Sequence, residues 1–310
     1  EITTRLVGSE MCIRDRSYKE AAMKQGHAVY STKTKILRGV VWILMLILAL
    51  FMVFPILYIV LGSFKENSEL LVGGTNIFPS KWVFTNYSDA WKQANFATYT
   101  LNSIFLALGV MIITLITSTM TGYVFSRRNF WGKEVLYSLF VAFMFINVGS
   151  VSLRPLFELA VKLKMNKNLL SVVLISVGTG QATYIFLCRG FVNSLPRELD
   201  EAAKIDGCTF FQTYRLVIMP LLKPVMATIA LLSFRQGWNE YILPLVFTMT
   251  NDKLRPLTVG VNMLKNAGDG AAAWNIMFAG ATIAIIPMLI TYCIFSRYFM
   301  GGMTTGAVKG

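Results

Sequence analysis

The stretch Val40–Leu61, VVWILMLILALFMVFPILYIVL, decides the fold of this chain, because it runs for 22 residues without a charged side chain. About 20 apolar residues in an α-helix cross the hydrocarbon core of a bilayer, which is roughly 30 Å thick. Of all 310 residues, 55% are hydrophobic and 15% are charged, whereas about a quarter of the residues of a soluble domain are charged. The sequence therefore predicts an all-α integral membrane protein.

Five more apolar runs of helical length follow the first. Together they predict a polytopic protein with six transmembrane helices, at Val40–Leu61, Ser103–Phe125, Val135–Leu153, Leu169–Leu187, Leu221–Met249 and Trp274–Phe295. The chain then divides into an amino-terminal tail (1–39), the first helix (40–61), an external segment (62–102), a core with five helices (103–298) and a carboxyl-terminal tail (299–310).

The basic residues predict the orientation of these helices. If the amino terminus is cytoplasmic, the cytoplasmic segments hold 17 Lys and Arg residues, or 18 with Lys223 at the membrane edge, and the external loops hold ten. Cytoplasmic loops are enriched in Lys and Arg, so both termini are expected in the cytoplasm, with the chain in the cell's inner or plasma membrane. The net charge of +13 then reflects orientation and contact with anionic membrane lipid. No basic-aromatic motif points to nucleic acid.

Residues 1–22, EITTRLVGSEMCIRDRSYKEAA, stand apart from the rest of the chain. They are polar, show no periodicity and lack the apolar core of a signal peptide. Two interpretations remain open: a disordered tail, or sequence that does not belong to the natural protein, with Met23 as the natural start.

Few side chains of this sequence are suited to catalysis or to metal binding. His27 is the single histidine, and the four cysteines show neither CxxC nor metal-site spacing. HExxH, GxSxG and the nucleotide-binding GxxxxGK[ST] pattern are all missing. We therefore predict no enzyme, no catalytic or metal-binding residue and no cofactor held by this chain. If ATP powers the protein, a separate subunit must bind and hydrolyse it.

The loop 193–224 predicts two short helices on the cytoplasmic side. Ser194 is expected to cap the first helix, with Pro196 in its first turn. Acidic side chains near a helix start interact favourably with the helix dipole. Those residues are Glu198, Asp200 and Glu201. Gly207 is expected to end the first helix in a left-handed conformation.

The second helix of the loop is predicted to start after Thr209, which forms a capping-box pattern with Gln212. It is predicted to stop or bend at Pro220. In the first helix, the small side chains of Ala202 and Ala203 would let another protein approach closely. The residues alone leave two interpretations open: an amphipathic loop resting on the bilayer, or a docking surface.

This loop resembles the EAA loop of binding-protein-dependent ABC importer permeases, which reads EAA, then D-G, then a distal Ile and Pro. The matching residues are Glu201, Ala202, Ala203, Asp206, Gly207, Ile218 and Pro220. The resemblance extends from Lys35 to the carboxyl terminus. WNEYILPL at Trp238–Leu245 and the ending GGMTTGAVKG resemble carbohydrate permeases, in particular the maltose-type second permease subunit.

The resemblance implies a type I ABC importer permease fold and a coupling role for the seven matched residues, in a helix that docks on an ATPase. It implies four kinds of partner: ABC ATPase subunits, a second permease subunit, an external solute-binding protein and membrane lipid. It favours a sugar as the transported solute. An ABC permease for a non-sugar solute is the alternative.

The fifth predicted span carries an unusual polar cluster: Arg235, Gln236, Trp238, Asn239 and Glu240. Charged side chains inside a membrane usually face protein or water. These residues are therefore predicted either to line a translocation path or to form a structural network between helices. An ion-coupled secondary transporter is a further alternative, but such proteins need intramembrane acids and often inverted repeats. Glu240 is the one clear acid within the predicted spans.

Overall fold

The computed structural model describes residues 32–73, 76–93, 95–146, 149–264 and 272–307, and all regular secondary structure in these ranges is helical. The chain divides into two units, Glu1–Leu57 and Tyr58–Gly310, which are described separately. Of the predicted tail 1–39, residues 1–31 lie outside the described residues. The interpretations of residues 1–22, and of Met23, therefore lie outside them as well.

The first unit consists of most of helix α2, Thr32–Gly62. Every side chain described between Ile36 and Leu57 is exposed, although this is the most apolar helix of the chain. A helix that is hydrophobic on all sides is stable only inside protein or membrane. Helix α2 therefore suits the interior of a membrane. It contains the whole of the first predicted span and continues through Pro55.

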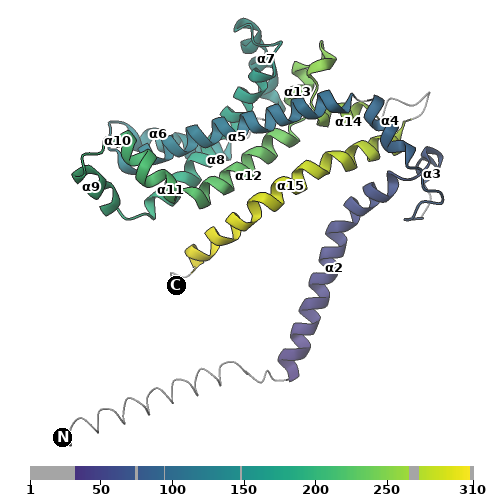
Figure 1. The fold of residues 1–310 in the computed structure, drawn as a ribbon, viewed down its shortest axis with the longest axis horizontal. Helices are drawn as coiled ribbons and strands as arrows, with labels where there is room; N and C mark the ends of the chain where they lie inside the picture. Colours follow the sequence, from purple (N-terminus) through teal and green to yellow (C-terminus); the bar gives the residue numbers. More distant parts are fainter. Residues whose placement is uncertain (1–31, 74–75, 94, 147–148, 265–271, 308–310) are drawn as a thin grey trace, which may run out of the picture. The chain divides into compact units, whose positions relative to one another are not determined.

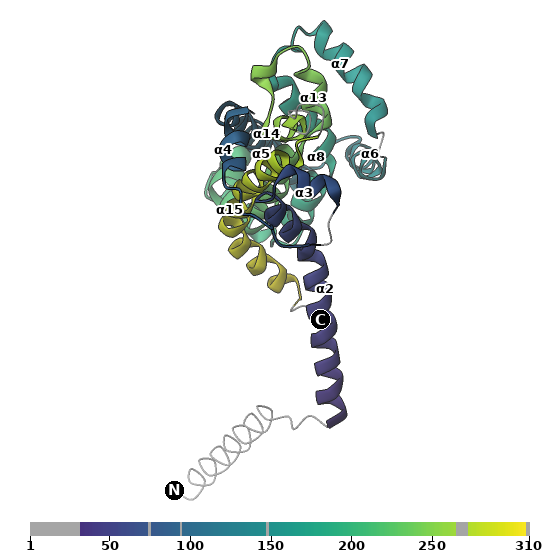
Figure 2. The same cartoon turned by 90° about the vertical axis from the view of Figure 1, so that its right-hand side faces the viewer.

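The second unit is a bundle of helices (Figure 1). Its long members are α5 (Phe96–Arg127), α8 (Leu169–Asn193), α12 (Lys223–Asn239) and α15 (Trp274–Ala307). Helix α5 packs along both α8 and α12, and α12 packs along α15 (Figures 1 and 2). Glycines permit close approach: a Cβ on Gly122 would lie 2.7 Å from Cys188 Cβ. Small residues at helix contacts are typical of membrane bundles.

Short helices occupy the two ends of this bundle. At one end lie α9 (Glu198–Ile205), α10 (Phe210–Gln212) and α11 (Met219–Leu221). At the other lie α3 (Asn67–Val72), α4 (Thr85–Gln93) and α14 (Leu257–Met263) (Figure 1). The loop 193–224 and the external segment 62–102 are therefore at opposite ends, as a chain crossing a membrane requires.

Four helices of the described chain are long and apolar enough to cross a membrane. They are Ile36–Gly62, Phe96–Arg127, Leu169–Asn193 and Trp274–Phe295. They contain the first, second, fourth and sixth predicted spans. Helix α15 continues to Ala307, so most of the predicted tail 299–310 is helical. The chain is a multi-pass helical membrane protein.

The third and fifth predicted spans differ from the structure. Within Val135–Leu153, helix α6 (Lys133–Phe145) ends early, and a 3-10 turn at Gly149–Ser152 leads into α7 (Leu153–Lys162). Thirteen residues of α-helix extend only about 20 Å, so α6 alone is short for a bilayer. The fifth predicted span, Leu221–Met249, is interrupted where α12 ends at Asn239 and α13 (Ile242–Phe247) begins. An 81° bend also separates α12 from the helical stretch Phe210–Leu221.

The external segment is tied to the start of α15 by a buried asparagine. Asn86 donates hydrogen bonds from Nδ2 to the carbonyls of Ser63 (2.8 Å) and Lys65 (2.9 Å), and its Oδ1 accepts one from Asn275 (2.9 Å). The neighbouring Lys65 is also buried, and it pairs with Glu69 at 3.1 Å. Burial would raise the pKa of the Glu69 carboxyl, but the hydrogen bonds from Lys65 and Ser80 outweigh it and hold this pKa below its usual value.

Replacing Asn86 with Ala is expected to destabilise the external segment by about 2 kcal/mol, because buried carbonyl and amide groups would lose their partners. Limited proteolysis of the detergent-solubilised protein should then cut within residues 62–95 faster than in the wild type. Gln93→Ala, an exposed change on the same helix α4, is the control and should leave the rate unchanged. Equal rates for both variants would show that the Asn86 contacts contribute little.

Candidate functional site: the helix–turn–helix loop

The loop between α8 and α12 begins with helix α9, which ends in a complete Schellman motif. Gly207 has φ +80°, a left-handed conformation that glycine adopts without strain. The N–H of Cys208 donates to the carbonyl of Ala203 (2.9 Å), and the N–H of Gly207 donates to that of Lys204 (3.1 Å). These two bonds are the pair that defines the motif. The prediction that Gly207 ends the first helix in a left-handed conformation is therefore confirmed.

The second arm starts with the predicted capping box. The N–H of Gln212 donates to Thr209 Oγ1 (3.3 Å), and the N–H of Thr209 donates to Gln212 Oε1 (2.8 Å). The helix continues from α10 through a π-helical stretch, Thr213–Ile218, into α11. It ends at Leu221, one residue beyond Pro220. Such π-helical stretches are rare and often mark functional regions.

The start of the first arm differs from the prediction. Ser194 does not cap α9, because its hydroxyl donates back to the carbonyl of Phe191 (2.7 Å) at the end of α8. Helix α9 begins only at Glu198, so Pro196 precedes the helix instead of lying in its first turn. The three acidic side chains do lie in the first turn of α9, as predicted.

The seven motif residues divide into an exposed group and a buried group. Glu201, Ala202, Asp206, Gly207 and Pro220 are exposed. Ala203 and Ile218 are buried, and Ile218 is fully inaccessible in a cluster with Cys188, Tyr214 and Leu222. The exposed face also presents large apolar side chains: Ile205 is 87% exposed and Phe211 is 55% exposed. The loop therefore presents an apolar surface that the described chain itself does not cover.

Three residues hold this loop: Tyr123 and Arg127 in the last turns of α5, and Arg128 directly after it. The sequence did not single them out. Tyr123 donates to Asp200 Oδ1 at 2.7 Å, and Arg127 Nε lies 2.9 Å from Asp200 Oδ2. Phe210, in the second arm of the loop, stacks on the Tyr123 ring with a centroid distance of 4.7 Å. The Arg128 guanidinium carbon lies over the same Phe210 ring, 4.3 Å from its centroid. The only signal in the sequence is that Arg127 and Arg128 are adjacent. Basic residues are expected in any cytoplasmic loop, so this pair does not by itself indicate a contact with the loop.

The polar cluster of α12 is partly a network between helices. Gln236 donates to the carbonyl of Ser176 (2.8 Å) and accepts from Tyr184 (2.9 Å), both on α8. Trp238 is buried, and its indole N–H donates to the carbonyl of Ala284 (3.3 Å) on α15. These contacts agree with the structural alternative for Gln236 and Trp238.

The other members of the cluster lie elsewhere. Arg235 and Asn239 are four residues apart, share one helix face and are exposed. In the described part of the chain, Arg235 has no ion-pair partner. Glu240 lies at the break after α12, where its side chain accepts from the N–H of Leu243 (3.4 Å) and its carbonyl accepts from Thr258 (2.9 Å). Glu240 thus stabilises an irregular backbone and does not pair with Arg235.

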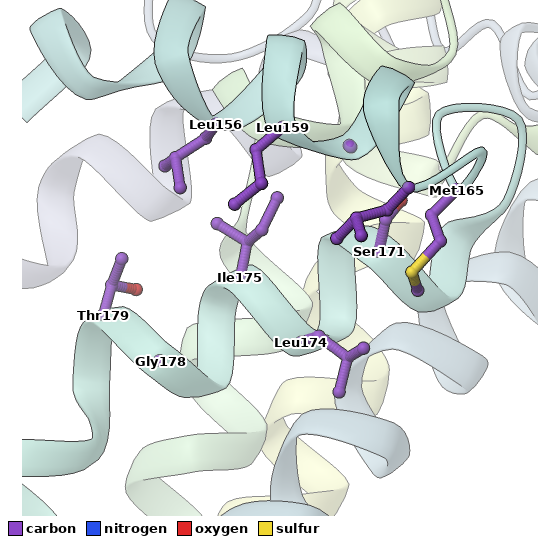
Figure 3. A pocket seen from close by; sticks show the side chains of 10 residues that line it. Leu156, Leu159, Met165, Ser171, Leu174, Ile175, Gly178 and Thr179 are labelled. Carbon is purple, nitrogen blue, oxygen red and sulfur yellow. The ribbon is translucent and has the colours of Figure 1, made fainter.

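Two cavities lie in the described bundle, and both are lined mostly by apolar side chains. A cavity of about 590 Å³ adjoins the break, and its largely aliphatic lining also contains Trp238, Asn239, Tyr241 and Tyr292. A second, of about 370 Å³, lies between α7 and α8, where Leu156 and Leu159 point toward Ile175 (Figure 3). Its two hydroxyls, on Ser171 and Thr179, already bond to helix carbonyls. The second cavity is therefore suited to apolar groups.

The described chain is a bundle of membrane-length helices with a helix–turn–helix loop at one end. Residues 116–304 match the family described as "Binding-protein-dependent transport system inner membrane component". The chain belongs to this family, as the EAA-loop resemblance predicted. It is therefore a transport subunit and not an enzyme.

Individual relatives agree with this assignment. The arabinooligosaccharides transport system permease protein AraQ of Halalkalibacterium halodurans is 32% identical over 85% of this chain and 93% of its own. The diacetylchitobiose uptake system permease protein NgcG of Streptomyces coelicolor is 27% identical over 86% of this chain and 87% of its own. A solved bacterial ABC transporter involved in the import of the acidic polysaccharide alginate has a chain that matches with a TM-score of 0.76 and 25% identity. That match covers 88% of this chain and all of the other.

Proposed function

We propose that this chain is a permease subunit of an ATP-driven ABC importer for sugars or oligosaccharides. The observation that carries the proposal is the helix–turn–helix loop, whose exposed apolar surface lies at the end of the bundle opposite the external segment. The proposed assembly contains a second permease subunit, ABC ATPase subunits and an external solute-binding protein. The chain itself holds no cofactor, since ATP is bound by the ATPase subunits.

Helix α9 is the proposed coupling helix, which enters a cleft of the ATPase. Its exposed motif residues Glu201, Ala202 and Asp206 would contact the ATPase, and Ile205 would bury its apolar side chain there. Ala203 and Ile218 would instead hold the loop against the bundle, because both are buried. Gly207 sets the angle between the two arms, and Pro220 lies just before the bend into α12.

Six crossings with both termini in the cytoplasm are the proposed topology. Four are the long apolar helices, and the fifth is α12 with its bend. The sixth is α6, which packs against α8. The excess of Lys and Arg on the side that holds the helix–turn–helix loop supports this orientation. The type I permease architecture is part of the same proposal.

The proposed translocation path passes the break between α12 and α13. Irregular backbone at membrane depth is tolerated where it is buried in protein or lines a water-filled cavity. Most of the lining of the cavity there is aliphatic, and the Asn239 amide and the rings of Tyr241 and Tyr292 are the groups that would contact an uncharged, hydroxyl-rich ligand. Arg235 would lie on the same face as Asn239, and Glu240 would fix the shape of the break.

The first test is purification of the tagged chain from its own membranes in mild detergent, with its partners identified by mass spectrometry. We expect an ABC ATPase and a second permease to copurify. Ile205→Glu should release the ATPase but retain the permease, because it places a charge in the proposed docking surface. Trp131→Glu, which changes a 99% exposed side chain outside the loop, is the matched control. A chain that purifies alone and moves solute without ATP would instead be a secondary transporter.

The sugar assignment has its own test. The named relatives handle arabino-oligosaccharides and diacetylchitobiose, so uptake of labelled oligosaccharides should be lost from cells that lack this chain. Loss of amino acid or polyamine uptake, with oligosaccharide uptake intact, would contradict the sugar assignment and leave the ABC permease assignment in place.

A further inference from the structure

We infer that Tyr123 and Arg127 are positioning residues for coupling: they hold α9 through Asp200, so that α5 is the helix that moves with the loop. The inference rests on the proposed coupling function of α9. It concerns a step inside this chain, between the docking surface and the transmembrane bundle.

Asp200 is the contact point on α9. Its carboxylate accepts the Tyr123 hydroxyl at 2.7 Å, and its other oxygen lies 2.9 Å from Arg127 Nε as an ion pair without hydrogen-bond alignment. The Arg127 side chain is 7% exposed and that of Asp200 is 20% exposed. Low exposure strengthens such a pair relative to one in water. Asp200 therefore points into the bundle, while its neighbour Glu201 is exposed.

Arg127 also holds the turn that precedes α9. Its second guanidinium nitrogen donates to the carbonyl of Leu195 (2.9 Å) and lies 3.4 Å from that of Pro196. The guanidinium is a rigid planar fork, so these contacts fix one geometry. One side chain of α5 thus joins both the helix α9 and its leading turn.

The other arm of the loop meets the same turn of α5. Phe210 stacks on Tyr123, with 24° between the ring planes, and the Arg128 guanidinium lies over the Phe210 ring. A cavity of about 250 Å³ lies beside these contacts, lined by Lys204 and Cys208 among others. Apolar packing therefore covers only part of the junction, and the polar contacts bridge the rest.

Helix α5 is placed to pass such movement on. It packs along both α8 and α12, and Gly237 of α12 lies directly against the α5 backbone. The covalent route from the loop to α12, in contrast, runs through the 81° bend at Leu222. The contacts to α5 are thus a direct route from α9 into the bundle.

The test is the number of solute molecules transported per ATP hydrolysed, measured in proteoliposomes with the complete transporter. Asp200→Asn keeps the shape of the side chain but removes its charge, and Tyr123→Phe keeps the ring that stacks on Phe210. We expect about a tenfold lower ratio for Asp200→Asn, because it removes the ion pair with Arg127 and weakens the hydrogen bond from Tyr123. Tyr123→Phe removes only that hydrogen bond and should lower the ratio less. The ATPase should stay bound and hydrolyse ATP in both variants.

Two comparisons separate positioning from simple structural support. Glu198→Gln neutralises an exposed carboxylate on the same helix and should leave the ratio unchanged. The exchanged pair Arg127→Asp with Asp200→Arg should recover part of the lost coupling. An unchanged ratio in Asp200→Asn, or release of the ATPase by it, would overturn the inference while the proposed function stands. Failure of the wild-type chain to recruit an ATPase would overturn both.

Discussion

Replacing Gly207 with Val is expected to abolish coupled transport, with a rate about a tenth of wild type or lower, while the chain still inserts in the membrane. At φ +80° a residue with a Cβ costs about 1–2 kcal/mol, and a β-branched residue is rarer still in this conformation. Each 1.4 kcal/mol is a factor of about ten in a population. The loop would therefore leave its native turn and lose the two hydrogen bonds that end α9. Uptake by reconstituted transporter measures the effect.

The matched control for this change is Gly207→Asn. A Cβ at this position would meet no atom within 4 Å, so the penalty for Val comes from backbone conformation and not from a clash. Asparagine tolerates the left-handed conformation better than other residues with a Cβ. It should therefore keep most of the transport. If Val and Asn transport equally well, the turn at Gly207 does not set the coupling geometry.

The parts of the loop that could be predicted from the sequence are those fixed by local chemistry. The turn at Gly207 and the capping box of Thr209 with Gln212 each involve residues within a few positions of one another, so composition and spacing are enough. Ser194 shows the limit of this reasoning. Its hydroxyl can either donate to a carbonyl at the end of the preceding helix or accept from an amide at the start of the following one. Because α8 extends to Asn193, the hydroxyl donates to the carbonyl of Phe191.

The features that the sequence did not predict depend on contacts between distant residues. The break after Asn239 contains neither Gly nor Pro, and it is stabilised by Thr258, 18 residues beyond Glu240. The pairing of Arg127 with Asp200 likewise joins two helices, α5 and α9, that are separated in the chain by α6, α7 and α8. Hydropathy locates apolar segments, but it gives no information on hydrogen bonds or ion pairs between residues that are distant in the chain. It therefore identified the four long spans and overestimated the continuity of the other two.

The cluster on α12 is explained by the helical period. Successive residues point about 100° apart, so Gln236, Gly237 and Trp238 reach α8, α5 and α15 in turn. Arg235 and Asn239 are left on the uncovered face. The contacts thus support the structural-network alternative for Gln236 and Trp238, and the proposed translocation path involves the other members of the cluster.

Gly237 is the point where this arrangement is least tolerant, and Gly237→Val is expected to prevent α12 from packing on α5. A Cβ there would lie 2.9 Å from Ala107 Cα and 3.1 Å from the carbonyl oxygen of Leu106. Both are backbone atoms, so no side-chain rotation relieves the contact and the helices must separate. Overpacking of a core costs about 1–3 kcal/mol or more, and here it acts on the contact that would pass movement from α5 to α12. The yield of monodisperse protein and its unfolding temperature in detergent should both fall.

A helical glycine in open surroundings provides the control for that experiment. A Cβ on Gly190 of α8 would meet no atom within 4 Å, and Val has a slightly better helix propensity than Gly. Gly190→Val should therefore keep the wild-type unfolding temperature. If Gly237→Val keeps it too, α5 and α12 are not in tight backbone contact, and a route for movement from the loop through α5 to α12 loses its second step. If only Gly237→Val lowers it, the close contact is real, and the smaller Gly237→Ala can then be assayed for solute transported per ATP.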